Sequence, residues 1–408
     1  MALIEARNGT DSGVGPSRAP VLPPKLQRLG QGPLMVEFRP LSACASLRDA
    51  WSHLAAQPLQ PNVFYEPDFL LSAMQHLASA QQVVVLLVWA EGQGSRQLAG
   101  LMPVLLPRLP FGPGEARGFR NSHMSSGVPL VRAERAAEVI AAMLDTLAAR
   151  SPRCSALMFP QIDLEGAFAK TLLRVTQATS RRHSLFGIRQ SPSLRLNDSR
   201  SVTSVERHSP EFQRQLAEIR AALGRHGKVT LVEASEGQAL RDGVELFMAL
   251  EASGPEGRAG TAMMLDARTA SFIRMATRMM ARSHQCRTLT LMLDDRPLAA
   301  AIAYASGNRA WFVKLSHDET FASDMPEALL ADALAQRFGG LRRMTLLDAS
   351  AQAGNAAVEQ VLNDKLATAD ILVSSRSGDS PAALAVRMRE RLASSAASLM
   401  RQWKGERA

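Results

Sequence analysis

The order of expected helices and strands occurs twice along the chain, and this repetition constrains the fold more than any other feature. In the first half, the sequence predicts a helix at 68–78, a hairpin at 83–89 and 97–106, a strand at 117–120, a helix at 132–149 and a strand at 155–160. The second half repeats the order at 267–282, 287–293, 298–305, 310–315, 326–338 and 344–348. Few residues are identical between the two halves, so the repeat is one of structural elements and not of sequence. Two similar α/β modules of about 170 residues are therefore expected.

The 408 residues divide around these two modules. Residues 1–33 carry Gly, Pro, Ser and Arg without apolar periodicity, which predicts a disordered tail. A polar stretch at 191–209 is interpreted as a connection. The modules are then expected at 34–190 and 210–375, with a basic amphipathic helix in 376–408.

The charge balance argues against nucleic acid as a partner. Lys and Arg number 47 against 38 Asp and Glu, a net charge of +9, and only six of the basic residues are lysine. This charge is spread thinly over the modules, whereas the segment from 381 onward has a net charge of +4. The helix expected at 381–403 would lie on an anionic membrane surface, bind a protein partner or pack on its own domain.

The cysteines and the apolar stretches indicate a cytoplasmic protein, with peripheral contact to the inner membrane as an option. Cys44, Cys154 and Cys286 are far apart and odd in number, which disfavours a disulfide framework and a Cys-rich zinc site. No other metal-ligand spacing, nucleophile elbow or Walker loop occurs, so no metal is expected. The N-terminus lacks a secretion-signal pattern, and the uncharged stretch 69–90 contains too many polar residues for a membrane span.

The order helix, hairpin, strand, loop, helix, strand, short helix and strand resembles the GNAT acyltransferase fold. Two such modules in tandem resemble the FemAB-like peptidoglycan-bridge architecture. The expected fold class is therefore α/β with a mixed sheet and two tandem GNAT modules. The resemblance implies acetyl-CoA or another acyl-CoA as co-substrate, its phosphates at the start of the helix 326–338. Asp324, Met325 and Pro326 stand at this helix entry, where free backbone N–H groups attract anions.

The second module resembles a more specific family. Its stretch Leu250-Glu-Ala-Ser-Gly-Pro-Glu-Gly-Arg-Ala-Gly-Thr-Ala262 is similar to the Leu-Glu-x-x-x-x-Lys-Gly-x-x-Gly-Thr-Ala signature of the CelD/BcsL acetyltransferase family. The aromatic-x-Lys strand and the Asp-Glu loop of that family read here Trp311-Phe-Val-Lys314 and His317-Asp-Glu319. The resemblance covers roughly residues 40–375 and implies a bacterial enzyme of cellulose or exopolysaccharide biosynthesis.

Three residues are the candidate catalytic groups. Asp318 and Glu319 follow a strand, and transfer of an acyl group to an amine or hydroxyl needs a base near the nucleophile. Adjacent residues rarely both face a cleft, so one of the two is expected to act. Lys314 would orient a phosphate or carboxylate or polarise a carbonyl, with a solvent-facing strand charge as the alternative.

Five further residues are candidates for substrate binding. Arg258, Gly260 and Thr261 form the patch most similar to the family, and a simple turn is the alternative interpretation. His317 precedes the carboxylate pair. Tyr304 offers a phenol that would protonate a departing thiolate, with packing in the core as the alternative.

The expected function is acyl transfer to a small-molecule, sugar or envelope-precursor acceptor, and two alternatives stay open. Glu256 replaces the signature's lysine, and Asp324-Met-Pro-Glu327 replaces the family's Ser-Pro-Gly. Asp324 and Glu327 form a capping-box pattern whose carboxylates would compete with a pyrophosphate for the same N–H groups. A non-catalytic binding or scaffold protein is therefore one alternative, and a FemAB-like aminoacyl transferase is the other.

Overall fold

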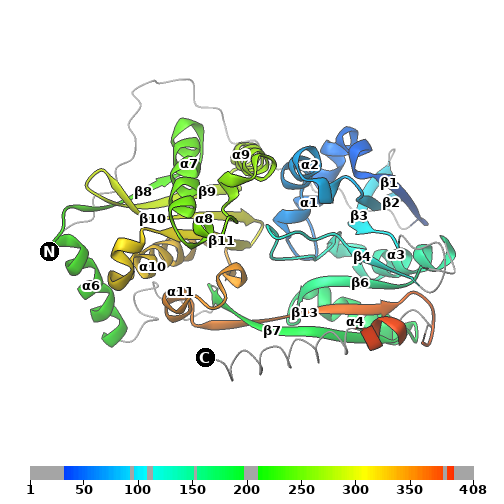
Figure 1. Cartoon of the computed structure of the whole chain (residues 1–408). Helices are drawn as coiled ribbons and strands as arrows, with labels where there is room; N and C mark the ends of the chain where they lie inside the picture. Colours follow the sequence, from blue (N-terminus) through cyan, green and yellow to red (C-terminus); the bar gives the residue numbers. More distant parts are fainter. Residues whose placement is uncertain are drawn as a thin grey trace. The chain divides into compact units, whose positions relative to one another are not determined.

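The computed structural model describes residues 32–91, 96–107, 114–150, 154–196, 210–379 and 384–389. The chain divides into two compact units (Figure 1). Among the described residues, unit 1 comprises Asp68–Leu77 and Ser191–Leu366, and unit 2 comprises the rest. Each unit therefore contains segments that are far apart in the sequence.

Unit 2 is built on a mixed sheet whose neighbouring strands run β1-β2-β3-β4-β6-β13-β7, with β5 paired to β3. These strands are β1 (Leu34–Pro40), β2 (Val84–Glu91), β3 (Arg96–Leu105), β4 (Gly114–Gly118), β5 (Leu130–Val131), β6 (Cys154–Asp163), β7 (His183–Arg195) and β13 (Asp364–Ser374). The hairpin β2–β3 is antiparallel, β4 runs parallel to β6, and β13 is antiparallel to β6. Helices of the same unit are α1 (Arg48–Ala55), α3 (Ala136–Arg150) and α4 (Ala167–Ala178).

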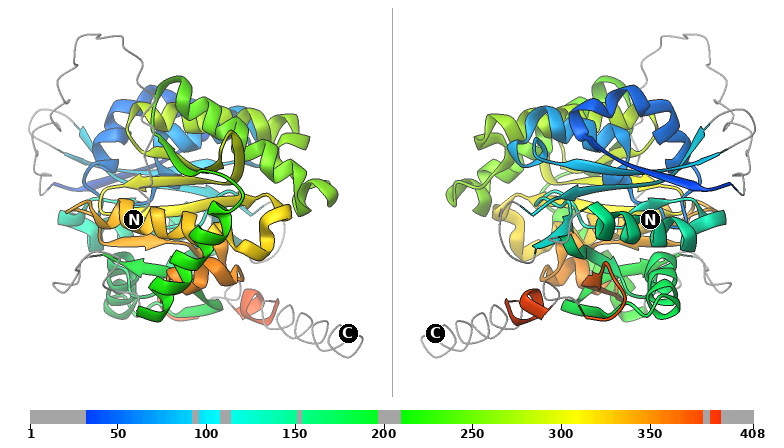
Figure 2. Two further views of the ribbon diagram at one scale, coloured as in Figure 1. Left: turned by 90° about the vertical axis from the view of Figure 1, so that its left-hand side faces the viewer. Right: turned by 90° about the vertical axis from the view of Figure 1, so that its right-hand side faces the viewer.

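Unit 1 carries the strand order β7-β12-β11-β10-β9-β8, where only the end of β7 takes part. Its other strands are β8 (Val229–Ala234), β9 (Cys286–Leu293), β10 (Arg296–Ser306), β11 (Arg309–His317) and β12 (Leu346–Asp348). Its helices are α2 (Pro67–His76), α6 (Pro210–Gly224), α7 (Gly237–Ser253), α8 (Pro255–Arg258), α9 (Ala267–Arg282), α10 (Pro326–Gly339) and α11 (Ala356–Val361). Figure 2 shows α7 and α9 on one face of strands β8 to β11, and α6 and α10 on the other.

Local sequence explains where the helices of unit 1 begin and which face they bury. The Asp266 carboxylate accepts hydrogen bonds from the N–H groups of Arg268 and Thr269 and so caps α9. Helix α2 joins this unit because Phe69 packs edge-on against Phe272, with ring centroids 5.3 Å apart. Helix α10 is buried nearly all round, which fits its position between the sheet and α6 and α11.

The strand β11 is irregular, and its irregularity decides which side chains share a face. Ile302 pairs with Lys314, but the next residue, Ala303, pairs with Phe312, so β11 carries one extra residue at Val313. Phe312 consequently faces the core beside α10, while Lys314 faces α7. On its other edge, β11 runs parallel to β12 over three residue pairs only, from Arg309↔Leu346 to Trp311↔Asp348.

The predicted fold class is confirmed, since helices and a mixed sheet form both units and the expected elements of the repeat are present. Helix α9 covers the predicted residues, and α10 ends one residue later than predicted. The strand expected at 117–120 is β4, at Gly114–Gly118. The sequence reasoning missed α4, α7, β7 and β8.

Three predictions concern segments that the structure describes only in part. The tail expected at 1–33 lies outside the described residues apart from 32 and 33. Strand β7 continues to Arg195, into the segment interpreted as a connection, whose residues 197–209 are not described. Of the C-terminal segment 381–403, residues 384–389 are helical, and the others lie outside the described residues. Within the part of the chain that is described, no helix has the length and apolar character needed to cross a bilayer.

Candidate functional site

Lys314 and Glu251 form the ion pair at the centre of the candidate site. The bulge in β11 directs Lys314 towards α7, where its Nζ lies 3.2 Å from Oε1 of Glu251. The Glu251 side chain is only 3% exposed, and its Oε2 accepts a hydrogen bond from the backbone N–H of Met263 at 2.7 Å. Glu251 thereby joins the Leu250–Ala262 motif to the strand that carries Lys314.

The motif itself forms a compact turn with two glycine requirements. A Cβ at Gly257 would lie 1.8 Å from the carbonyl oxygen of Ala252, and Gly260 has a φ of +72°. The Glu256 carbonyl accepts hydrogen bonds from the N–H groups of Thr261 and Ala262, and the Thr261 hydroxyl lies 3.3 Å from the same oxygen. The residues at 256–262 are thus fixed by backbone contacts, with Thr261 exposed.

Arg258 and Glu319 join this turn to the loop after β11. Two guanidinium nitrogens of Arg258 contact the two carboxylate oxygens of Glu319, at 2.5 and 2.8 Å. The hydrogen bonds from Arg258 lower the pKa of Glu319 below its usual range. Glu319 is therefore an ionised carboxylate already held by a cation, and it is a weak proton acceptor while that pair persists.

Asp318 is held in a similar way. Its carboxylate accepts hydrogen bonds from the N–H and hydroxyl of Thr320 and contacts the guanidinium of Arg296. Partial burial raises its pKa, but the bonds to Thr320 and Arg296 outweigh this effect, so the pKa lies below its usual value. Asp318 caps the short 3-10 helix Glu319–Asp324, which is a structural role.

His317 lies opposite a different carboxylate. It is the last residue of β11 and pairs with Ala299, which places it on the α10 side of the sheet. Its Nδ1 is 3.4 Å from Oε1 of Glu327, and the other Glu327 oxygen is buried without a hydrogen-bond partner. Glu327 of α10 thus pairs with a histidine, whereas Asp318 and Glu319 of the preceding loop pair with arginines.

The start of α10 differs from the capping box predicted for Asp324 and Glu327. That prediction is wrong, because the N-cap residue is Met325, in the left-handed region with φ +44°, and no side chain caps the helix. Pro326 occupies the first helical position, and Glu327 turns towards His317 instead of towards the helix N-terminus. The free N–H groups at this end therefore meet no carboxylate from a capping box.

Tyr304 lies away from solvent. It is 1% exposed, and its ring packs against Phe69 with centroids 6.2 Å apart. Burial holds the pKa of its hydroxyl well above the usual value. These contacts place Tyr304 in the core between the sheet and α2, as the packing interpretation anticipated.

Beside these groups, β11 extends beyond the end of its parallel neighbour β12. After Trp311↔Asp348 the two strands no longer pair, although β11 continues to His317. The amide of Gln352 enters this space and donates to the carbonyl of Val313, the bulged residue, at 3.3 Å. The edge of β11 beyond Trp311 is thus free of β12 and lies just before the loop that leads to α10.

The sequence did not single out Glu251 as a site residue, and its spacing assigned Glu327 to a capping box. Glu251 continues the apolar stripe of α7 that contains Val244, Phe247 and Met248, and all four are buried. A glutamate at a stripe position is the signal that identifies a paired, buried carboxylate. For Glu327 the Asp-x-x-Glu spacing indicated a cap, and only the left-handed backbone at Met325 redirects it.

A family comparison decides the assignment of unit 1. Residues 211–353 match the family described as acetyltransferase (GNAT) domain. Unit 1 has the fold of a GNAT domain. This match encloses all candidate residues from Glu251 to Gln352. Among curated proteins, none matches the sequence.

Solved structures extend the similarity beyond this GNAT domain. The crystal structure of FemX matches with a TM-score of 0.55 and 10% identity, over 80% of this chain and 95% of FemX. A conserved protein of unknown function from Bacteroides thetaiotaomicron VPI-5482 matches with a TM-score of 0.50 and 9% identity, over 83% of this chain and 100% of that one. A tandem GNAT protein from the clavulanic acid biosynthesis pathway has a TM-score of 0.41 and 16% identity, over 85% of this chain and 100% of its own. At these identities the first two similarities establish a shared fold that spans most of the chain.

No metal enters this assignment. In the residues that the structure describes, no group of three or more His, Cys, Asp or Glu side chains is arranged to hold a metal ion.

Proposed function

We propose that this chain is an acyltransferase that moves an acyl group from an acyl-CoA, with acetyl-CoA as the first candidate, to an amine or hydroxyl. The observation that carries the proposal is the GNAT acetyltransferase match over residues 211–353. The candidate side chains on α7, α8, β11 and α10 all lie within that segment and within unit 1.

The donor is proposed to bind where β11 leaves β12. Beyond Trp311 the edge of β11 that faces away from β10 is not paired with β12, and its backbone groups would bond to an extended amide-containing chain. The start of α10, at Met325 and Pro326, offers uncapped N–H groups and the positive end of the helix dipole to the phosphates. Gln352, which bonds to the Val313 carbonyl, would have to move aside or contact the bound chain.

The acceptor is proposed to approach the turn that carries Arg258, Gly260 and Thr261. Its nucleophilic nitrogen or oxygen attacks the thioester carbonyl carbon, the C–S bond breaks, and the sulfur leaves as a thiolate. One proton leaves the acceptor, and we assign it to His317, which Glu327 orients at 3.4 Å. Asp318 and Glu319 are weaker candidates because bonds from Thr320 and Arg296 to the first, and from Arg258 to the second, lower the pKa of both carboxylates and so make them weaker bases.

Lys314 is proposed to act through its position beside Glu251. One-third of its side chain is exposed, so the ammonium group can contact a bound substrate while Glu251 keeps it in place. The acceptor class remains that of the CelD/BcsL resemblance: a sugar or envelope precursor of polysaccharide biosynthesis. The motifs at Leu250–Ala262 and Trp311–Lys314 support this class because the Glu251–Lys314 contact joins them.

Calorimetric titration of the full chain with acetyl-CoA tests the donor. Binding to the native state should give a saturable heat and raise the melting temperature. His317→Gln should keep donor binding and lower kcat, and Lys314→Ala should lower turnover in a chain that still folds. Arg268→Gln, an exposed change near the start of α9, is the matched control and should leave both unchanged. Absence of binding at millimolar acetyl-CoA would leave the non-catalytic scaffold as the better reading.

The second candidate function is aminoacyl transfer, and the similarity in fold to FemX favours it. The discriminating experiment offers aminoacyl-tRNA and acetyl-CoA in parallel with a radiolabelled acyl group. Label transferred only from the tRNA would replace acetyl-CoA as donor and keep the assignment of acyl transfer.

A further inference from the structure

A cavity of unit 1 lies away from the candidate acyl-transfer residues. It has a volume of about 440 Å³ and is bounded by α6, β8, β9 and α10. None of the residues lining it belongs to the Leu250–Ala262 motif or to the loop after β11. Its size falls in the range of small-molecule sites.

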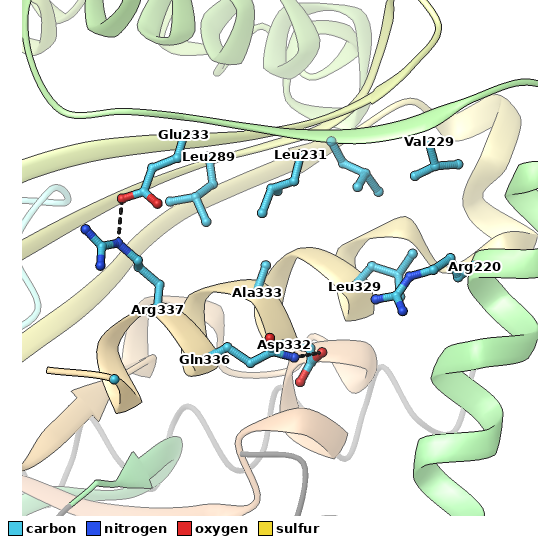
Figure 3. Close-up of a pocket in the computed structure, with 12 residues that line it drawn as sticks. Arg220, Val229, Leu231, Glu233, Leu289, Leu329, Asp332, Ala333, Gln336 and Arg337 are labelled. Carbon is cyan, nitrogen blue, oxygen red and sulfur yellow. Dashed lines mark hydrogen bonds and ion pairs between the residues drawn. The ribbon is translucent and has the colours of Figure 1, made fainter. Parts of the chain in front are cut away.

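The two long walls of this cavity have the same order of side chains (Figure 3). On β8, Val229, Leu231 and Glu233 alternate along one face, and on α10, Leu329, Ala333 and Arg337 recur every four residues. Each wall thus runs from two apolar residues to one charged residue. From the rise per residue of a strand and of a helix, both walls are about 12–13 Å long.

One end of the cavity is closed by charge pairing. Oε1 of Glu233 accepts a hydrogen bond from Nε of Arg337 at 2.7 Å, and it also contacts the guanidinium of Arg287. Leu289 and Leu291 of β9 complete the apolar lining between the walls. Two guanidinium groups therefore hold Oε1 of the carboxylate at this end, and the space next to it is apolar.

The other end presents a cation with unused hydrogen-bonding capacity. Arg220 reaches the cavity from α6, opposite the Glu233–Arg337 pair (Figure 3). Its Nε is buried and, in the part of the chain that the structure describes, has no hydrogen-bond partner. Asp332 also lines the cavity, but its Oδ2 accepts a bond from Gln336 at 2.7 Å. A buried guanidinium N–H without a partner costs free energy unless a ligand satisfies it.

We infer that this cavity binds a linear amphiphile with an anionic head group, namely a medium-chain carboxylate. The carboxylate pairs with Arg220, and the alkyl chain lies along Val229, Leu231, Leu329 and Ala333 towards the closed end. A planar guanidinium matches a carboxylate in geometry, and the apolar walls match a chain without polar atoms. The cavity contains none of the candidate acyl-transfer residues, so this inference does not depend on the proposed function.

Titration of the full chain with decanoate, decanol and acetate, all below the micellar range, tests the inference. Decanoate should bind and raise the melting temperature, decanol should bind about ten-fold more weakly, and acetate should not bind measurably. Arg220→Gln should reduce decanoate affinity about ten-fold and leave decanol affinity unchanged. Arg214→Gln, at an exposed position of the same helix, should change neither.

A second variant tests the position of the chain. Ala333→Leu places extra methyl groups in the slot while keeping a good helix former in α10, and it should abolish binding of both decanoate and decanol. Equal affinity of the native protein for decanoate and decanol, full decanoate affinity in Arg220→Gln, or no binding of decanoate at all would each overturn the inference. Acetyl-CoA binding should be unaffected by Arg220→Gln and Ala333→Leu. Measured in the same samples, it distinguishes failure of the decanoate site from failure of the proposed function.

Discussion

Glu251 and Lys314 have unequal environments, and the difference sets what each contributes. The carboxylate is buried and satisfied by one cation and one backbone N–H, whereas one-third of the lysine side chain is in contact with solvent. Removing the lysine strands a buried charge, while removing the carboxylate leaves a lysine that can turn to water. The pair therefore links the two sequence motifs. Its loss should destabilise the protein mainly when the lysine is removed, because the buried carboxylate then lacks its cation.

Lys314→Met should lower the free energy of unfolding by about 2 kcal/mol, because the Glu251 carboxylate stays buried with only the Met263 N–H as a partner. Urea unfolding measures this change. In the double variant with Glu251→Gln the loss should be smaller than the sum of the two single losses, because the stranded charge is gone. Strictly additive losses would mean that the two side chains do not interact in solution.

The lowered pKa of Asp318 leads to a prediction about the free energy of unfolding at low pH. Its pKa is lowered in the folded state, so its contribution is present above the unfolded pKa and is lost as the pH falls through the lowered folded value. Asp318→Asn keeps an N-cap acceptor for Thr320 but removes the titration. The unfolding free energy of this variant should therefore fall less steeply than that of the native chain as the pH drops below about 5. Identical slopes in urea titrations at each pH would contradict the assignment.

At the scale of elements, the short helix α8 depends on the absence of a side chain at Gly257. A Cβ there would meet the Ala252 carbonyl oxygen at 1.8 Å, so the turn cannot keep its position with alanine. Gly257→Ala should cost about 1–3 kcal/mol and displace Arg258 from Glu319. Calorimetric melting measures the stability, and a loss of the protection of Glu319 in carboxyl-labelling experiments reports the displacement.

Gly260 supplies the comparison for this prediction. It has a positive φ but open space around it, so Gly260→Asn should cost less than Gly257→Ala, because asparagine tolerates the left-handed region. If the asparagine variant is the less stable of the two, backbone conformation rather than close approach controls the turn.

The elements that could be predicted from sequence are those whose signals are local. Asp266 before an apolar stripe marks the start of α9, and Pro326 marks the first turn of α10, so both helices were placed within a residue. The candidate residues at 258, 314 and 317–319 were found through motifs, and the structure gathers them around the end of β11. Their pairing could not be found that way: Glu251 belongs to the same motif as Arg258, but its contact with Lys314, like that of Arg296 with Asp318, arises only through tertiary packing.

At the scale of the whole molecule, sequence order and spatial order differ. Strand β13 comes at the end of the second repeat, yet it pairs with β6 in unit 2, where Leu372 lies opposite Met158. Ile371 and Val373 belong to the core of that unit, together with Leu157 and Phe159. The sequence Asp370–Ser374 is typical of a strand but carries no information about the neighbour of that strand.

A chain that ends at Leu366 should therefore lose stability in unit 2, although all the deleted residues lie at the C-terminus. It removes most of β13, exposes the edge of β6 and leaves Phe159 without Ile371 and Val373. Proteolysis followed by mass spectrometry should show early cleavage between residues 34 and 190 in the truncated chain. A chain ending at Gly378 keeps β13 and should resist cleavage there as the full chain does.

The placement of β13 also sets the order of events during synthesis. Residues 34–190 emerge from the ribosome first, but the sheet they form lacks one central strand until residue 374 has been made. Translation at about 5–20 residues per second leaves β6 without that neighbour for roughly ten seconds or longer. Through that interval an unpaired central edge is open to other nascent chains, so the N-terminal part of this protein is expected to depend on chaperones more than its compact final form suggests.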